Sequence, residues 1–268
     1  MQRTIVLAIA GSDSGGGAGI QADLKSIHAQ GAHAVTVLTA ITAQNTMSVQ
    51  RAEALPLDLI QDQLDAVCDD FEIRAVKTGM LARSDIVELV ASHLKRRQAK
   101  RIVVDPVMIS KHGKPLLVDD AVDALQTRLI PLAHVVTPNL HEAQRLAGRA
   151  IGSREEMEEA ARRILSLGPR AVVVKGGHLQ EGAAPDLLMT TKGAVWVEGE
   201  RFETPHTHGT GCTFASALAA RLALGEPLET AVAETKRFIT EAIRRSLHIG
   251  HGLGPVDPLY AIPGAREV

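Results

Sequence analysis

The stretch Thr4–Gly19, TIVLAIAGSDSGGGAG, joins a short apolar run to a loop crowded with glycine. The run Thr4–Ala10 has the length and composition of a buried β-strand and is far too short to span a membrane. Four of the five residues 15–19 are glycine, which costs conformational entropy and indicates a backbone that comes close to a ligand. The simpler alternative is a flexible turn between a strand and a helix.

This glycine loop lacks the features of two common phosphate-binding loops. No Gly-Lys-Ser/Thr closes it, as a P-loop requires. Ala22 occupies the place where the third glycine of a dinucleotide fingerprint would fall. The loop therefore predicts a ligand site of another kind.

Apolar runs like the first one recur along the chain and alternate with longer helical patterns. Near-continuous Val, Ile, Leu and Ala are typical of parallel strands that are covered on both faces. The predicted strands are Thr4–Ala10, Ala34–Thr42, Ala75–Thr78, Arg101–Val104, His134–Thr137 and Ala171–Lys175. The predicted helices are Ala18–Gln30, Leu57–Asp69, Ser84–Arg97, Asp119–Leu129, Leu140–Ala147, Arg154–Leu167, Thr213–Leu224 and Leu228–Leu247.

The region Asp186–Glu203 differs from this pattern. Two apolar triplets, Leu187–Met189 and Val195–Val197, flank Lys192-Gly193, which predicts an antiparallel hairpin at one edge of the sheet. We therefore expect an α/β fold, an α/β/α sandwich with a mainly parallel central sheet. No linker or repeat divides residues 1–268, which are interpreted as one domain, with the tail after Leu247 wrapping the surface.

Composition and charge argue against several classes of protein. Lys plus Arg number 29 and Asp plus Glu number 31, a net charge of −2, whereas nucleic-acid binding normally shows as a basic surplus. Aromatic residues make up 2%, too few for base-stacking platforms. The sequence shows no membrane span or signal peptide, so we expect a cytoplasmic protein in which Cys68 and Cys212 are reduced thiols. Cys68 is interpreted as a packing residue.

Polar, acidic and glycine residues directly follow the predicted strands. Because the carboxyl ends of parallel strands meet at one edge of a sheet, where open α/β sheets bind their ligands, these residues are expected to line a site. They are Gly11–Asp13, Gln44–Thr46, Gly79-Met80, Asp105-Pro106, Pro138-Asn139 and Gly176-Gly177.

A second glycine segment, His208–Thr213, directly precedes an apolar-periodic helix. Backbone N–H groups at a helix N-terminus bind anions, and Gly209 and Gly211 would let the backbone approach a phosphate. Thr210 as an ordinary N-cap is the simpler interpretation, but it leaves the glycines unexplained. Cys212 would lie in the first turn, where the helix dipole is expected to lower the pKa of its thiol.

Asp105, Asn139 and Glu142 are candidates for holding phosphates and Mg²⁺. Asn139 and Glu142 are three residues apart at a helix start, a spacing that fits a capping box equally well. Asp105 follows a buried strand, where an acid is also a common turn former. Near phosphates, the two carboxylates could hold water around Mg²⁺, which keeps several waters when it binds.

Seven short blocks, in order, resemble the bacterial hydroxymethylpyrimidine/phosphomethylpyrimidine kinases. Each block alone is only weakly or moderately specific, but the ordered set, from near residue 5 to about 225, is highly specific. The blocks are Gly11–Asp23, Thr39–Thr46, Lys77–Leu81, Val104–Met108, Thr137–Ala143, Lys175–His178 and Thr207–Thr213.

The resemblance implies a ribokinase-like fold and an enzyme of thiamine biosynthesis. Such an enzyme phosphorylates 4-amino-5-hydroxymethyl-2-methylpyrimidine and then its monophosphate, using ATP and Mg²⁺, and its relatives are often homodimers. By matching position, the pyrimidine would contact Gly11, Asp23, Gln44, Met80 and Val107. The amide of Gln44 offers both a donor and an acceptor, which suits the edge of an aminopyrimidine.

The same resemblance assigns the phosphate end of the site. Facing ATP would be Asp105, Asn139, Glu142, Lys175 and Thr207, with Asp105 and Glu142 holding Mg²⁺ through water. The catalytic anion hole would be made by Gly209, Thr210, Gly211 and Cys212.

Cys212 replaces the aspartate that follows the glycines in the wider ribokinase pattern. We expect its thiolate to take the hydroxymethyl proton in the first phosphorylation only, because the phosphate oxygen that attacks in the second is already ionised.

Two other functions remain open on the sequence. A pyridoxal or pyridoxine kinase, or a dual-specificity enzyme of the same fold, would share these blocks. A non-catalytic pyrimidine- or nucleotide-binding module would not need Cys212, Asp105 and Glu142 together.

Overall fold

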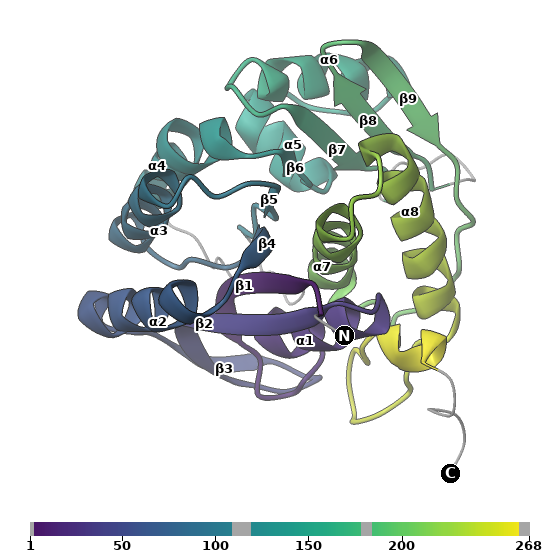
Figure 1. Cartoon of the computed structure of the whole chain (residues 1–268). Coiled ribbons are helices and arrows are strands. Elements are labelled where there is room, and N and C mark those ends of the chain that lie inside the picture. The colour runs from purple at the N-terminus through teal and green to yellow at the C-terminus, as the bar shows by residue number, and fades with distance from the viewer. Residues whose placement is uncertain (1–2, 109–118, 178–183, 263–268) are drawn as a thin grey trace.

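The computed structural model describes residues 3–108, 119–177 and 184–262, and these residues build one continuous sheet (Figure 1). Within them the sheet has nine strands in the order β3-β2-β1-β4-β5-β6-β7-β8-β9. The strands are β1 (Ile5–Ser12), β2 (His33–Gln44), β3 (Val49–Ala54), β4 (Ile73–Thr78), β5 (Ile102–Val104), β6 (Val135–Val136), β7 (Ala171–Lys175), β8 (Asp186–Thr190) and β9 (Gly193–Val197). β1, β2 and β4–β7 run parallel, whereas β3, β8 and β9 pair antiparallel at the two edges.

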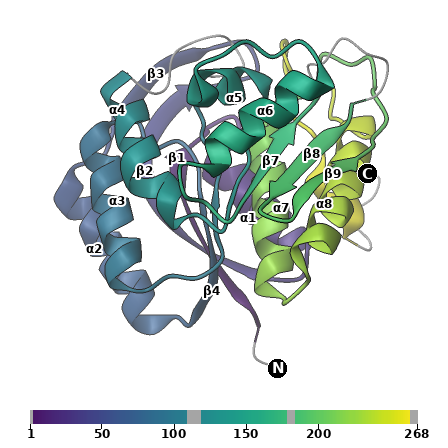
Figure 2. The ribbon, with the colours of Figure 1, turned by 90° about the horizontal axis from the view of Figure 1, so that it is seen from above.

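Helices cover both faces of this sheet. They are α1 (Gly19–Ala29), α2 (Leu57–Asp70), α3 (Ser84–Arg96), α4 (Asp119–Ala124), α5 (Leu140–Ala147), α6 (Arg154–Leu165), α7 (Thr210–Ala223) and α8 (Leu228–Arg244). A π-helical turn, Leu125–Leu129, continues α4, and short 3₁₀ turns follow at Ile130–Leu132 and Pro258–Ala261. Figure 1 shows α2, α3 and α4 on one side and α7 and α8 on the other, and Figure 2 shows α6 lying over β7 and β8.

The alternation of side chains along β1 explains the three layers. Leu7 and Ile9 enter the buried cluster that packs on α2, α3, α5 and α6, while Val6 and Ala8 enter the cluster that packs on α1, α7 and α8. A strand buried on both faces has no polar side to mark its register, which is why the sequence shows a continuous apolar run. The predicted three-layer α/β/α fold is confirmed.

The predicted strands and helices are confirmed to within a few residues, with two informative differences. The edge strand β3 was not predicted, because its sequence VQRAEA is mostly exposed and carries little apolar patterning. Helix α7 begins at Thr210 instead of Thr213, because Gly209 takes φ 79° and provides the N-cap without a side chain. Cys212 is therefore the third residue of the helix.

The glycine-rich tail packs against the loops at the carboxyl edge of the sheet. Leu253 N donates to the carbonyl of Thr46 at 2.8 Å, and Val256 N donates to the carbonyl of His208 at 3.1 Å. Among the helices of the described ranges, none has both the length and the apolar character that crossing a membrane requires.

Candidate active site

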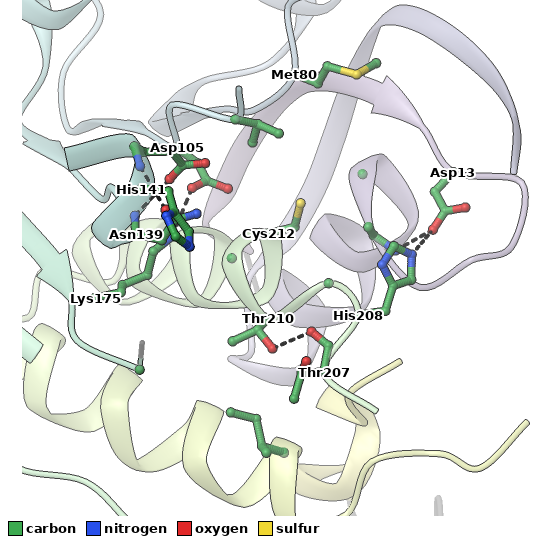
Figure 3. Close-up of a pocket in the computed structure, with 18 of the residues that line it drawn as sticks. Asp13, Met80, Asp105, Asn139, His141, Lys175, Thr207, His208, Thr210 and Cys212 are labelled. Carbon is green, nitrogen blue, oxygen red and sulfur yellow. Dashed lines mark hydrogen bonds and ion pairs between the residues drawn. The ribbon is translucent and has the colours of Figure 1, made fainter. Parts of the chain in front are cut away.

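A cleft of about 1020 Å³ opens at the carboxyl ends of the parallel strands (Figure 3). Thirteen of the fourteen residues that the sequence assigned to the site line this cleft; Asp23 does not. Those thirteen are Gly11, Gln44, Met80, Asp105, Val107, Asn139, Glu142, Lys175, Thr207, Gly209, Thr210, Gly211 and Cys212. Figure 3 shows Cys212 between the group that contains Asp105 and Lys175 and the pair formed by Asp13 and His208.

Asp105 and Lys175 form an ion pair at one end of the cleft. Lys175 Nζ lies 3.2 Å from Asp105 Oδ1, and Asp105 is 2% exposed. Within the described residues, Asp105 Oδ2 has no hydrogen-bond partner. A Cβ on Gly211 would lie 3.4 Å from Lys175 Nζ and 3.5 Å from Asp105 Oδ2, so the glycine turn approaches this pair closely.

Asn139 and Glu142 form the capping box of α5. Asn139 Oδ1 accepts from Glu142 N at 2.9 Å, and Glu142 Oε2 accepts from Asn139 N at 2.8 Å. Burial raises the pKa of Glu142 to about 7; Lys175 opposes this shift and Asp105 adds to it. The structural interpretation of this motif is thus correct, and both side chains also line the cleft.

The glycine turn places the start of α7 inside the cleft. A Cβ on Gly209 would collide with the carbonyl oxygen of Gly17, so the two glycine loops touch through their backbones. Thr210 Oγ1 donates to the carbonyl of Thr207 at 2.8 Å and does not act as the N-cap. The N–H groups of the first helical turn have no partner inside the helix, which suits them to an anion.

The expectation of a lowered pKa for Cys212 is wrong. Burial raises the pKa of this thiol to about 12, and the nearby ammonium of Lys77 opposes the shift without reversing it. The carboxylates of Asp23 and Asp105 raise it further. Desolvation of the thiolate is the largest of these effects, so the thiol is neutral at physiological pH.

Asp23 lies beneath the cleft and not on its surface. It is fully buried and accepts from Lys77 Nζ at 2.7 and 2.8 Å and from Ser216 Oγ at 2.7 Å. Burial lowers the pKa of Lys77, but the carboxylates of Asp23 and Asp105 outweigh it and the net shift is upward. Asp23 therefore ties α1 to β4 and α7, and the structure does not bring it to the proposed ring-binding surface.

The same cleft is lined by Gly11, Gln44, Met80 and Val107. A Cβ on Gly11 would collide with Met80 Cε, so a larger residue at this position would require the end of the Met80 side chain to shift. The carbonyl of Met80 accepts from Thr39 Oγ1 at 2.7 Å, which fixes the segment after β4. The result is a pocket with an apolar wall and one amide, suited to a flat heteroaromatic ring.

Asp13 and His208 also line the cleft, although no role of their own was predicted for them from the sequence. Asp13 Oδ2 accepts from Gly17 N at 3.0 Å and Ala18 N at 2.8 Å, and lies 2.8 Å from His208 Nε2. An aspartate inside a glycine loop and a histidine beside a glycine turn were the available signals. Their pairing across 195 residues was not visible in either motif.

The fit of a magnesium ion depends on Asp105. In the described ranges there is no cluster of three or more His, Cys, Asp or Glu side chains that could hold a metal. Mg²⁺ is commonly held by one or two carboxylates together with substrate phosphates and water. The unpartnered Oδ2 of Asp105, with Glu142 nearby, fits that mode of binding.

Comparisons with known proteins agree with this site. The family model described as phosphomethylpyrimidine kinase matches residues 13–257. A hydroxymethylpyrimidine/phosphomethylpyrimidine kinase from Streptomyces coelicolor is 47% identical over 96% of this chain and 95% of its own length. The thiamine biosynthesis bifunctional protein ThiED from Geobacter sulfurreducens is 48% identical over 99% of this chain, which spans only 54% of that protein.

Solved structures give the same fold. A pyridoxal kinase from Bacillus subtilis, in an ADP complex, has a TM-score of 0.91 at 40% identity and covers 96% of this chain and 98% of its own. A phosphomethylpyrimidine kinase from Clostridium difficile has a TM-score of 0.80 at 44% identity, and the match covers 90% of this chain and 100% of that protein's chain. With its sequence matched along most of its length by the family model and by a full-length relative, the chain belongs to the phosphomethylpyrimidine kinase family.

Proposed function

We propose that this chain transfers phosphoryl groups from ATP to 4-amino-5-hydroxymethyl-2-methylpyrimidine and then to the resulting monophosphate. The observation that carries the proposal is the arrangement of one cleft. Asp105 and Lys175 lie on one side of Cys212, Asp13 and His208 lie on the other, and Gln44, Met80 and the turn Gly209–Cys212 line the same cleft. Relatives named for both phosphorylations support it.

The two steps differ only in the attacking oxygen. In the first, the hydroxymethyl oxygen bonds to the γ-phosphorus, the bond to the β-phosphate breaks, and the hydroxyl proton must leave. In the second, an ionised phosphate oxygen attacks and no proton has to be removed. In both, the N–H groups of the glycine turn and the Lys175 ammonium stabilise charge on the transferring group.

The raised pKa of Cys212 changes the role proposed for this residue. A neutral thiol is a poor proton acceptor, so we assign Cys212 to positioning the hydroxymethyl group beside the glycine turn. The hydroxyl proton then passes late to an oxygen of the transferring phosphoryl group, as the new P–O bond forms, which is compatible with the loose transition state of phosphoryl transfer.

We assign Mg²⁺ to the side of the phosphates that faces Asp105 and Glu142. When bound there, it would neutralise charge on the phosphate oxygens. Consumption of ATP and the two free thiols of the described residues also support a cytoplasmic location. A homodimer is proposed from the resemblance alone, and light scattering of the purified protein would test it.

Pyridoxal phosphorylation is the second candidate function. The specific observation in its favour is the close fold match to pyridoxal kinases, including one from Staphylococcus aureus solved with AMP-PCP and pyridoxal, with a TM-score of 0.90. Turnover of the aminopyrimidine alcohol and of pyridoxal should be compared side by side at equal ATP. We expect the aminopyrimidine to have the higher kcat/KM; a wide preference for pyridoxal would reverse the assignment.

A further inference from the structure

Another buried ion pair lies behind the cleft, where β8 begins. Lys236 Nζ, from α8, lies 2.9 Å from Asp186 Oδ1, and the two residues are 7% and 2% exposed. Neither side chain lines the cleft, so contact with a substrate does not explain the pair. Because the desolvation of two charges can offset their attraction, a purely stabilising role does not explain it either.

Hydrogen bonds join this pair to the backbone of the cleft wall. Lys236 Nζ also donates to the carbonyl of Ala184 at 2.6 Å, and Asp186 Oδ1 accepts from Gly176 N at 3.0 Å. Ala184 lines the cleft, and Gly176 directly follows Lys175, which lines it as well. The pair therefore holds the chain where it leaves β7 and where it enters β8.

The register of the sheet places Asp186 beside Lys175. The two residues are directly opposite in the antiparallel pair of β7 and β8, so their side chains share one face with Cβ atoms about 4.5–5.5 Å apart. Val173 and Leu188, two residues away on each strand, belong to the cluster that packs on α7 and α8, which identifies that face. Asp186 is thus a second carboxylate within reach of the Lys175 ammonium, in competition with Asp105.

In the structure, the two lysines are divided between the two carboxylates. Lys175 Nζ lies 3.2 Å from Asp105 Oδ1 (Figure 3), whereas Asp186 accepts from Lys236 and from the Gly176 N–H. If the Lys236 ammonium were removed, Asp186 would be a buried carboxylate that has lost its cation, which is costly. Lys175, the cation opposite it in the sheet, would then turn to Asp186 and leave Asp105.

We propose that Lys236 is a positioning residue for phosphoryl transfer, because it occupies Asp186 and so leaves Lys175 to face Asp105 and the transferring phosphate. Lys236 touches neither the substrates nor the reacting atoms, and it acts through Lys175. This inference rests on the proposed kinase function, which assigns Lys175 to stabilise charge on the transferring group. Removal of the Lys236 charge slows the reaction in this scheme, and removal of the Asp186 charge as well restores it.

The test compares Lys236→Met with the double variant Lys236→Met/Asp186→Asn, using the aminopyrimidine alcohol and its monophosphate as acceptors. In Lys236→Met, kcat at saturating ATP should fall about tenfold with both acceptors, while KM for each acceptor stays within about twofold. Asp186→Asn keeps an acceptor for Gly176 N but removes the competing charge. The double variant should therefore regain a kcat within about threefold of the wild type.

Each outcome decides between the possibilities. A wild-type protein that phosphorylates neither acceptor refutes the proposed function itself. An unchanged kcat in Lys236→Met overturns the role of Lys236. A double variant as slow as Lys236→Met also overturns it, because a loss of packing or of the bond to Ala184 would persist in both proteins.

Arg237→Met is the matched control on the same helix. It removes one cation of the exposed Arg237–Glu234 pair, outside the cleft, and should leave kcat within about twofold of the wild type. If Lys236→Met does not fold, Lys236→Gln replaces it with the same expectations, because its amide removes the charge but keeps a neutral donor.

A crystal structure of the wild-type protein with AMP-PCP needs no variant. Lys236 should remain on Asp186, with Lys175 Nζ at hydrogen-bond distance from the terminal phosphate group. A Lys175 bound to Asp186, or a Lys236 that has moved to the phosphates, would overturn the inference.

Discussion

The ammonium of Lys175 lies 3.2 Å from Asp105 Oδ1, and the other oxygen of that carboxylate has no hydrogen-bond partner in the part of the chain that the structure describes. Two opposite charges thus meet at the proposed phosphate site of the cleft, and one carboxylate oxygen is left to accept a further bond. Lys175 comes from the end of β7 and Asp105 follows β5, so the parallel sheet itself places the pair.

Lys175→Met should impair both phosphorylations equally. The variant keeps most of the aliphatic stem but removes the charge that faces the transferring group, so kcat/KM for ATP should fall about 100-fold with either acceptor. Steady-state kinetics with alcohol and with monophosphate measure this. Lys192→Met, at an exposed position outside the cleft, is the matched control, and a loss confined to one acceptor would contradict the shared phosphate site.

Asp23→Ala should act on stability more than on substrate binding. It would leave the Lys77 ammonium buried without its partner, at a cost of about 3–5 kcal/mol in the free energy of unfolding. Urea denaturation measures this, with Arg51→Ala at the exposed Arg51–Glu53 pair as the control, where about 0–1 kcal/mol is expected. A stable Asp23→Ala protein with a raised KM for the pyrimidine would restore Asp23 to the ring site.

Gly209 and Gly211 should respond differently to alanine. Gly209 has φ 79°, which is strained for alanine, and the added Cβ would collide with Gly17 O. The Gly209→Ala protein should therefore unfold at a lower temperature than the wild type. A Cβ on Gly211 meets Lys175 and Asp105 only at ordinary contact distances, so Gly211→Ala should fold normally, yet lose about 100-fold in kcat because the methyl group fills the anion space.

Calorimetry and steady-state kinetics on the two glycine variants separate these effects. Gly31→Ala is the control, because Gly31 also has a positive φ but a Cβ there would meet nothing within 4 Å among the described residues. It should lower the free energy of unfolding by about 1–2 kcal/mol and leave kcat unchanged. Full activity in Gly211→Ala would place the transferring group elsewhere.

The sequence predicts which residues line the site better than it predicts their pKa values and their hydrogen-bond partners. Residues at strand ends and in glycine turns have positions that topology fixes, which is why Gly11, Asp105 and Gly209 all line the cleft. The pKa of Cys212 depends on burial by elements that are far apart in the chain. The position of Cys212 at a helix N-terminus predicts a lowered pKa, whereas burial raises it. The Asp13–His208 pair was missed for the same reason, since it forms only when the two glycine loops meet.

The thiol of Cys212 gives a pH test. Because its pKa is raised to about 12, the alcohol step should show no inflection from a thiolate between about pH 7 and 9. Cys212→Ala should lower kcat for the alcohol about tenfold and leave the shape of the pH profile unchanged. An inflection in that range that disappears in Cys212→Ala would identify the thiolate as the base after all.

The most direct measurement follows the products when the pyrimidine alcohol is limiting and ATP and Mg²⁺ are in excess. Anion-exchange separation should show the monophosphate rising and then falling as the diphosphate accumulates, with two ADP formed for each alcohol consumed. A reaction that stops at the monophosphate after one ADP, and that leaves added monophosphate untouched, would contradict two successive phosphorylations in this cleft.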